Sequence, residues 1–298
     1  MKITITGSLG HIGKPLTQDL VKAGHNVTVI TSNENKTKDI ESLGGKAAVG
    51  KLEDIEFVTE VFTGADSVFC MIPPDFSQAD QLEYYARLGS IYADAIRKTG
   101  VKRVVHLSSY GAHLPSGTGL ISGSYRTEQT FMGIQNIHLT LLRPTYFYYN
   151  LLHFTDTIKK AGFIGGVYGG EDKLPMVSPL DIATAAAEEL QIIDNVTRIR
   201  YINSDERTCN EVARVLGNVI GIPDLKWHTF PKDQVLKTML QNGMPENAAR
   251  NLVELGEALH TGKLMEDYEW NKPAFGKVKI EEYANEFAEI FKNGKSHH

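Results

Sequence analysis

Cysteine is scarce in this sequence: Cys70 and Cys209 are its two copies in 298 residues, and they lie far apart. A disulfide framework or a cysteine-based metal site needs more cysteines at closer spacing. Long hydrophobic runs are also missing, since no apolar stretch reaches the roughly 18 residues of a membrane helix. The first residues lack the basic and apolar regions of a signal peptide. We therefore expect a cytoplasmic protein without metal and without a membrane partner.

The sequence also lacks an excess of positive charge. The chain has 31 Lys and Arg against 36 Asp and Glu, a net charge of -5, and no cluster of basic residues. A nucleic-acid-binding surface needs a basic patch or stripe. We therefore expect a small-molecule substrate rather than a nucleic acid, on a chain that is a monomer or a homodimer.

The first 145 residues alternate short β-rich runs with longer amphipathic stretches. This alternation is typical of repeated βαβ units, and strands that are apolar throughout indicate a parallel sheet covered on both faces. The predicted strands are Lys2–Thr6, Asn26–Thr31, Lys46–Val49, Ser67–Ile72, Arg103–Leu107 and His138–Leu142. Predicted helices include Lys14–Ala23, Ile55–Phe62, Gln81–Thr99 and Ser124–Met132. The expected fold class is α/β with a doubly wound parallel sheet.

The segment "GSLGHIG" places three glycines, Gly7, Gly10 and Gly13, between the first predicted strand and the first predicted helix. In a Rossmann-type site the first glycine allows a tight turn and the second lets the backbone approach a pyrophosphate. The third lets the helix lie close to the strand, with its N–H groups directed at the phosphates. A tight turn without a ligand is the alternative, but the setting favours dinucleotide binding.

The character of the sequence changes after Pro144, where few strands are expected. "DQVLKTMLQNGMPENAARNLVELGEALHTG" predicts a helical hairpin with Gly243 and Pro245 at its turn. Asp181 in "PLDIA" is expected to cap a helix that starts near Ile182. We predict a Rossmann-type domain over 1–150 and a smaller, mainly helical substrate-side lobe over 151–294, with a tail or tag remnant at 295–298. The boundary is soft, and strands of the second part can return to the first.

The end of the second strand bears on the choice of cofactor. An NAD site usually has Asp or Glu there to bind the ribose 2′-OH, but this chain has Thr31–Asn33 and no carboxylate before Glu34. Hydroxyls, the Asn33 amide and the nearby Lys36 and Lys38 can instead accept a 2′-phosphate. Ordinary solvated loop residues are the alternative. The pattern favours NADP over NAD.

Several longer stretches narrow the class. They are "GADSVFCMIPP" (64–74), "VKRVVHLSSYGA" (101–112), "TEQTFMGIQNIHLTLLRPTYFYYNLL" (127–152), "MVSPLDIATAAAEEL" (176–190) and the C-terminal "NGMPENAARNLVELGEALHTGKL". With the glycine spacing, they resemble the NmrA-like family of atypical short-chain dehydrogenases/reductases. The resemblance covers nearly the whole chain and is closest to the branch typified by NADPH:quinone oxidoreductases and triphenylmethane or azo-dye reductases.

This resemblance, taken with the end of the second strand, implies a cofactor site in the loops that follow the strands. The expected cofactor residues are Gly7, Ser8, Leu9, Gly10, His11, Ile12, Thr31, Ser32, Asn33, Lys36, Leu52, Met71, Ile72, Pro73, Pro74, Ser108 and Ser109. Two positions depart from the family pattern. Ser32 stands where many relatives carry an arginine for the 2′-phosphate, and Lys51 replaces the aspartate of a "G-D-L" segment.

The aromatic run Tyr146–Tyr149 follows the last strand of the first half. It could stack a flat aromatic acceptor, or its alternate residues could fill the seam between the two lobes. Both interpretations stay open. The expected substrate-pocket residues are Tyr110, Tyr146 and Phe147.

The catalytic residues are not identified by the sequence. Short-chain dehydrogenases use Tyr-x-x-x-Lys, in which the lysine lowers the tyrosine pKa. In this chain Gln129 stands where that lysine would follow Tyr125. We therefore expect no such dyad, and Ser109, His113 and Tyr125 are weak candidates.

Reduction of a quinone needs mainly a positioned nicotinamide. We expect an NAD(P)H-dependent oxidoreductase that acts on a quinone-like or other flat aromatic acceptor. One alternative is a non-catalytic NAD(P)-binding redox sensor of the NmrA type, with a regulatory protein partner. Another is NAD-dependent epimerase/dehydratase-like chemistry.

Overall fold

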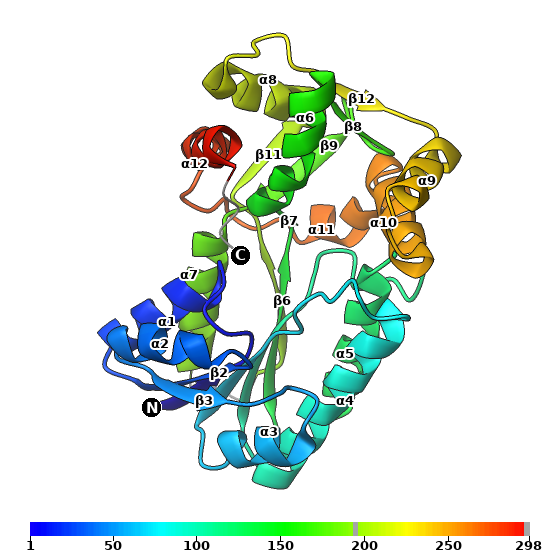
Figure 1. Ribbon diagram of the computed structural model, residues 1–298. Coiled ribbons are helices and arrows are strands. Elements are labelled where there is room, and N and C mark those ends of the chain that lie inside the picture. Colours follow the sequence, from blue (N-terminus) through cyan, green and yellow to red (C-terminus); the bar gives the residue numbers. More distant parts are fainter. Residues whose placement is uncertain (193–195, 295–298) are drawn as a thin grey trace.

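A computed structural model describes residues 1–192 and 196–294 (Figure 1). The strands are β1 (Lys2–Ile5), β2 (Asn26–Thr31), β3 (Lys46–Val49), β4 (Ser67–Cys70), β5 (Arg103–Leu107), β6 (His138–Pro144), β7 (Tyr146–Phe147), β8 (Ile164–Gly166), β9 (Lys173–Val177), β10 (Arg198–Ile202), β11 (Asp205–Thr208) and β12 (Trp227–Thr229). Seven of them form a sheet in the order β10-β6-β5-β4-β1-β2-β3, in which all neighbours are parallel. The chain order reverses between β1 and β4, which is where ligands bind in doubly wound sheets.

Helices cover both faces of this sheet and build the second part of the molecule. They are α1 (Gly13–Lys22), α2 (Thr37–Ser42), α3 (Ile55–Phe62), α4 (Gln81–Thr99), α5 (Ile121–Met132), α6 (Thr155–Ala161), α7 (Pro179–Gln191), α8 (Cys209–Ile220), α9 (Lys232–Gln241), α10 (Glu246–His260), α11 (Glu266–Trp270) and α12 (Ile280–Asn293), with the 3-10 helices η1 (Glu34–Lys36), η2 (Tyr148–Phe154) and η3 (Lys263–Met265). Helices α1 and α7 pack on one face, and α3, α4 and α5 pack on the other (Figure 1).

Consecutive strand residues supply the two faces in turn. Phe69 and Val105 belong to the apolar cluster under α1 and α7, whereas Val68 and Val104 belong to the cluster under α3, α4 and α5. Side chains of a strand alternate between faces, so a strand buried on both sides must be apolar at every position. This explains the continuous apolar runs of the sequence and confirms the predicted α/β class.

The rest of the chain forms a lobe over one end of the sheet (Figure 1). It contains the three-stranded sheet β11-β9-β7 and the pair β12-β8, with helices α6 and α8 to α12 around them. A third apolar cluster, which includes Tyr148, Trp227, Tyr268 and Phe287, forms its core. The predicted helical hairpin is confirmed as α9 and α10.

Several details differ from the sequence prediction. Strand β1 ends at Ile5 rather than Thr6, β4 ends at Cys70 rather than Ile72, and α1 spans Gly13–Lys22 rather than Lys14–Ala23. Helix α5 begins at Ile121 rather than Ser124, and its first four residues, 121–124, are all buried. Strand β6 continues to Pro144, whose carbonyl oxygen accepts from the N–H of Tyr110 at 3.0 Å. The N-cap of α7 is Ser178 and not Asp181, whose carboxylate instead accepts from the backbone N–H groups of residues 277 and 278.

The second half of the chain contributes to both parts of the molecule. Strand β10 is the edge strand beside β6, and α7 packs against α1. We propose that the chain divides near residue 150 and that 177–192 and 198–202 belong to the first part. The predicted tail, 295–298, lies outside the described residues. Among the helices that the structure describes, none has the length and apolarity needed to cross a bilayer.

His106 on β5 makes the stability of the fold depend on pH. Its side chain is 2% exposed, and Nδ1 lies 2.9 Å from the carbonyl oxygen of Cys70. Burial lowers the pKa of His106 from 6.5 to about 4. The unfolded chain therefore binds a proton below pH 6.5 that the folded chain does not bind until near pH 4. Stability is lost as the pH falls through this window.

We expect the free energy of unfolding to fall by about 2 kcal/mol between pH 7 and pH 5 because of this one group. His106→Asn keeps an N–H donor for Cys70 but does not titrate, so the loss should become smaller by that amount. Urea unfolding of both proteins at the two pH values measures it. An unchanged loss in the variant would assign the effect to other groups.

Candidate functional site

The loop after β1 turns sharply into α1. Gly7 and Ser8 have φ angles of 92° and 60°, a region that glycine adopts without strain. The N–H of Ser8 donates to the carbonyl oxygen of Ile30 at 3.0 Å, and its hydroxyl donates to Oγ1 of Thr31 at 2.9 Å. The loop is therefore tied to the end of β2.

The start of α1 has the properties of an anion-binding site. Ile12 is the N-cap residue without a side-chain hydrogen bond, and the first turn contains no acidic residue. Pro15 in that turn has no N–H. No carboxylate of this turn thus neutralises the positive end of the helix dipole, which favours a bound phosphate.

The three glycines of the loop meet different surroundings. A Cβ on Gly7 would lie 2.1 Å from Cε of Met71, and one on Gly13 would lie 2.0 Å from the carbonyl oxygen of Ser8. Position 13 thus requires glycine because a side chain would meet the backbone, whereas position 7 requires it because of the φ angle of 92°, since the end of the Met71 side chain can move. A Cβ on Gly10 would meet nothing within 4 Å. Packing does not explain glycine there, whereas a pyrophosphate resting on the loop does, so the residues present fit a dinucleotide.

The end of β2 would face the adenosine half of such a ligand. The N–H of Gly50 donates to the carbonyl oxygen of Thr31 at 2.9 Å, which brings the segment after β3 beside it. The Asn33 side chain accepts from the N–H of Asn35 at 3.0 Å and so caps η1. Of the predicted residues near this end, Ser32, Asn33, Lys38 and Lys51 are exposed and Lys36 and Leu52 are half-buried, and the carboxylate of Glu34, which follows Asn33, is exposed as well.

Met71, just after β4, is fixed above Gly7. Its N–H donates to the hydroxyl of Thr6 at 2.7 Å, and its carbonyl oxygen accepts from the hydroxyls of Thr6 and Tyr92 at 3.1 and 2.9 Å. The following Ile72 is buried, Pro73 is half-buried and Pro74 is exposed. This segment therefore runs from the core to the surface beside the glycine loop.

A buried ionic network lies behind the end of β5. The hydroxyl of Ser108 donates to Oε1 of Glu128 at 2.5 Å. Arg143 on β6 binds the same carboxylate with two hydrogen bonds, of 3.0 Å to Oε1 and 2.7 Å to Oε2. Both charged side chains are at most 5% exposed. Arg143 also donates to Asp267 on α11 at 2.9 Å and to the hydroxyl of Tyr201 at 3.1 Å.

The network holds its charges in place. Burial opposes the positive charge of Arg143, but the hydrogen bond and the charge of Glu128 raise its pKa overall. Tyr201 in turn donates a short hydrogen bond to Asp267. The network therefore joins the sheet, α5 and the lobe.

The three catalytic candidates lie in different surroundings. Ser109 is half-buried and follows Ser108 directly. The ring nitrogens of His113 are buried and have no hydrogen-bond partner within the described chain, and burial lowers its pKa. Tyr125 is half-buried on α5, and Gln129, one turn later, is exposed. The structure does not bring these three into one hydrogen-bonded group, and their roles stay predictions.

The aromatic run after β6 alternates between two sides. Tyr146 and Tyr148 pack with the lobe core, whereas Phe147 packs with the cluster under α1 and α7. The ring of Tyr149 stacks on His11 of the glycine loop, with centroids 4.6 Å apart and planes at 15°, and contacts Phe147 at 5.1 Å. The run therefore connects the glycine loop to the lobe.

Comparison with known proteins decides the family. The model of the NmrA-like family matches residues 1–289. The chain belongs to the NmrA-like family.

Relatives of this NmrA-like chain are distant. It is 24% identical over 261 residues to a (4-alkanoyl-5-oxo-2,5-dihydrofuran-3-yl)methyl phosphate reductase of Streptomyces griseus, covering 87% of this chain and 88% of that protein. It is also 24% identical to an NAD(P)H azoreductase of Xenophilus azovorans, over 85% of each chain. The structure of an Escherichia coli NADPH-dependent quinone oxidoreductase complexed with NADPH superposes with a TM-score of 0.81 at 20% identity, covering 95% and 99% of the two chains. This likeness confirms the fold.

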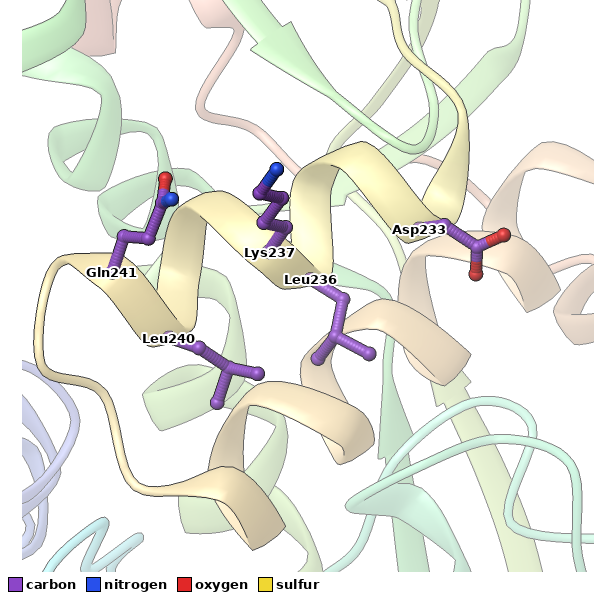
Figure 2. Close-up of a pocket in the computed structure, with 5 residues that line it drawn as sticks. All are labelled: Asp233, Leu236, Lys237, Leu240 and Gln241. Atoms are coloured by element: carbon purple, nitrogen blue, oxygen red, sulfur yellow. The ribbon is translucent and has the colours of Figure 1, made fainter.

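A separate hollow of about 410 Å³ lies along α9 (Figure 2). Its lining residues, Asp233, Leu236, Lys237, Leu240 and Gln241, all belong to that one helix. None of them follows a strand of the large sheet, and none was predicted as a site residue. A single helix without a converging polar group is not a ligand site of the usual kind.

Sequence reasoning on this NmrA-like chain missed Glu128, Arg143 and Asp267 as neighbours of the site, and it named Tyr149 in the aromatic run without choosing it as a pocket residue. A signal for the first two was present, because Glu128 and Arg143 sit within segments that are otherwise buried. A buried charge must be paired. Tyr149 and Asp267 reach the site through contacts that depend on the folded chain.

The glycine loop gives a direct test of ligand approach. Gly10→Ala adds a methyl group in open space, so we expect stability to change by less than about 1 kcal/mol. The same methyl group should weaken NADPH binding about tenfold or more, since it stands where the pyrophosphate would approach. Gly13→Ala is the matched control and should destabilise the fold by about 1–3 kcal/mol because of its clash with Ser8. Urea unfolding and calorimetric titration measure both, and unchanged NADPH affinity in Gly10→Ala would contradict this placement.

Proposed function

We propose that this NmrA-like chain is an NAD(P)H-dependent oxidoreductase that reduces a quinone-like or other flat aromatic acceptor. The observation that carries the proposal is the stack of His11 on Tyr149. It joins a loop suited to a pyrophosphate to the rings of Tyr149 and Phe147, which suit a flat acceptor, so both halves of a hydride-transfer site adjoin. The names of the reductase relatives support the same class of activity.

The proposed cofactor residues divide along the carboxyl edge of the sheet. Residues 7–12 hold the pyrophosphate on backbone N–H groups and the start of α1. Residues 71–74 line the central part, and Ser108 and Ser109 lie at the nicotinamide ribose. When bound, the cofactor supplies a hydride from its nicotinamide.

We also propose that NADP is preferred over NAD. The end of β2 has hydroxyl and amide side chains where an NAD site usually has a carboxylate that binds the ribose 2′-OH. Two lysines flank this end. Lys36 follows β2 in the chain, and Lys51 is brought beside it because the neighbouring Gly50 is hydrogen-bonded to Thr31. Lysine side chains there attract a 2′-phosphate as point charges.

Acceptor reduction makes few demands on acid–base groups. A quinone takes a hydride, which carries two electrons, and one proton to become a hydroquinone, and the proton can come from solvent. The protein then contributes mainly by holding the two rings in contact and by excluding water. Gln129 cannot act as the lysine of a Tyr-x-x-x-Lys dyad for Tyr125, and this reaction does not need one.

The test is turnover with menadione, followed by the loss of NADPH absorbance. We expect NADPH to be oxidised, with a higher kcat/KM than NADH, and we expect its dissociation constant to be lower. Tight dinucleotide binding without turnover across a panel of quinones would contradict the enzyme proposal. Equal kcat/KM values and equal dissociation constants for NADPH and NADH would contradict only the proposed preference for NADP.

A redox sensor is the second candidate, favoured by the glutamine at position 129 in place of lysine. A sensor must bind the oxidised and reduced cofactor with different affinity, because a ligand shifts a protein only through such a difference. Titration with all four dinucleotides separates the two functions. Strong discrimination between redox forms without turnover would favour the sensor.

A further inference from the structure

Four tyrosines belong to the apolar core of the lobe or pack against it, and we call them the phenol cluster: Tyr110, Tyr146, Tyr168 and Tyr283. Tyr110 follows β5, Tyr146 is on β7, Tyr168 follows β8 and Tyr283 is on α12. Tyr110 and Tyr283 are 3% and 5% exposed and belong to the lobe core, with Tyr146 and Tyr168 packed against it. Four separate segments thus bring phenol groups into one apolar cluster.

The hydroxyls of this cluster are short of acceptors. Tyr168 donates to the hydroxyl of Tyr146 at 3.0 Å, which leaves Tyr146 its own proton to donate. The buried hydroxyls of Tyr110 and Tyr283 have no hydrogen-bond partner within residues 1–192 and 196–294. Neighbouring Tyr148, by contrast, donates to the carbonyl oxygen of Val278 at 3.0 Å. Buried hydroxyls are normally paired, and an unpaired one is costly.

The phenol of Tyr146 influences the pKa of both unpaired phenols. Burial raises the pKa of Tyr110 well above 10, and the nearby phenol of Tyr146 raises it further. Burial is also the main cause of the raised pKa of Tyr283, with contributions from Glu286 and again from Tyr146. Both phenols are therefore neutral donors at ordinary pH, and both lie near the same group.

Two phenols of the cluster follow the strands that carry the proposed nicotinamide end. Tyr110 comes two residues after Ser108, and its N–H donates to the carbonyl oxygen of Pro144. Tyr146 follows Pro144 by two residues. Both phenols therefore start from the carboxyl ends of β5 and β6, where the acceptor of a hydride would lie.

We propose that the phenol cluster binds a carbonyl oxygen of the acceptor, with Tyr110, Tyr146 and Tyr283 as hydrogen-bond donors. This inference rests on the proposed function. As the hydride reaches the acceptor ring, negative charge develops on that oxygen, and fixed neutral donors stabilise it. A proton from solvent then completes the hydroxyl group, and no phenol is consumed.

The inference narrows the acceptor class. Donors of this kind favour a flat ring that carries a carbonyl oxygen, such as a quinone. A cationic triphenylmethane dye accepts a hydride on carbon and develops no oxygen anion, so it gains nothing from the cluster. The two acceptors should therefore respond differently when a hydroxyl is removed.

The kinetic test compares Tyr110→Phe with Tyr148→Phe, which removes a phenol that already has an acceptor. For Tyr110→Phe we expect kcat/KM with menadione to fall about tenfold or more, with crystal violet reduction and the NADPH dissociation constant unchanged. Its unfolding temperature should not fall, because the removed hydroxyl has no partner. Tyr148→Phe should lower the unfolding temperature and leave the ratio of the two activities unchanged.

A binding test needs no turnover. In a Trp270→Phe background, Trp227 is the remaining tryptophan, and its ring lies 5.4 Å from that of Tyr168. Menadione should quench its fluorescence, and Tyr110→Phe or Tyr283→Phe should weaken menadione binding about threefold to tenfold.

Two outcomes count against the claims and can be told apart. If the wild-type protein reduces menadione and the Tyr110→Phe and Tyr283→Phe variants match it in menadione affinity and in acceptor ratio, the cluster does not bind the oxygen and the oxidoreductase proposal stands. If the wild-type protein binds NADPH and reduces no acceptor, the proposed function fails and this inference fails with it.

Discussion

The buried pairing of Arg143 with Glu128 is the interaction on which the arrangement of the site depends. The two side chains are almost without solvent contact, so each charge requires the other. Removing one partner of such a pair costs about 3–5 kcal/mol, because a bare charge is left in the interior. Through its further bonds to Asp267 and Tyr201, Arg143 connects β6 to α11 and β10. The lobe is thus held against the strand ends from which Ser108 and Tyr110 emerge.

A second constraint shapes the cofactor side. The carbonyl oxygen of Ser8 occupies the space that a side chain at position 13 would need, so α1 starts directly beside the loop after β1. The loop has its left-handed residues at Gly7 and Ser8 and is tied to Thr31. The only glycine of the three that faces open space is Gly10. A loop that is tied to β2 and has open space at Gly10 fits the pyrophosphate that we propose it binds, and the neighbouring aromatic run fits the flat ring of the proposed acceptor.

Much of the sheet could be predicted because its strands carry local signals. β2, β3 and β5 have the predicted bounds. In β5 an apolar run marks a strand that is covered on both faces, whereas the edge strand β3, which has no buried residue, is marked by Gly45 and Gly50 on either side. Helix α4 is bounded by Asp80, whose side chain caps it, and by Gly100 in a left-handed conformation. The lobe strands were not predicted, because β7 and β8 have two and three residues and show no period. Their pairing is decided by the folded chain.

The site divides in the same way. The glycine loop is recognisable because three neighbouring residues carry its geometry. The rest of the site joins segments that are distant in the sequence. This holds for the ionic network of Ser108, Glu128, Arg143 and Asp267 and for the phenol cluster. The expectation that Asp181 caps α7 was wrong for a related reason. Ser178 already supplies the cap, and Asp181 binds the backbone near residue 277.

The measurement that tests the central claim most directly is a single-turnover reaction of enzyme-bound NADPH with excess menadione, using NADPH that carries deuterium at the transferred position. The account predicts that the bound nicotinamide is oxidised and that deuterium slows the step, because hydride transfer is then observed without product release. Bound NADPH that keeps its absorbance in the presence of menadione would contradict the account.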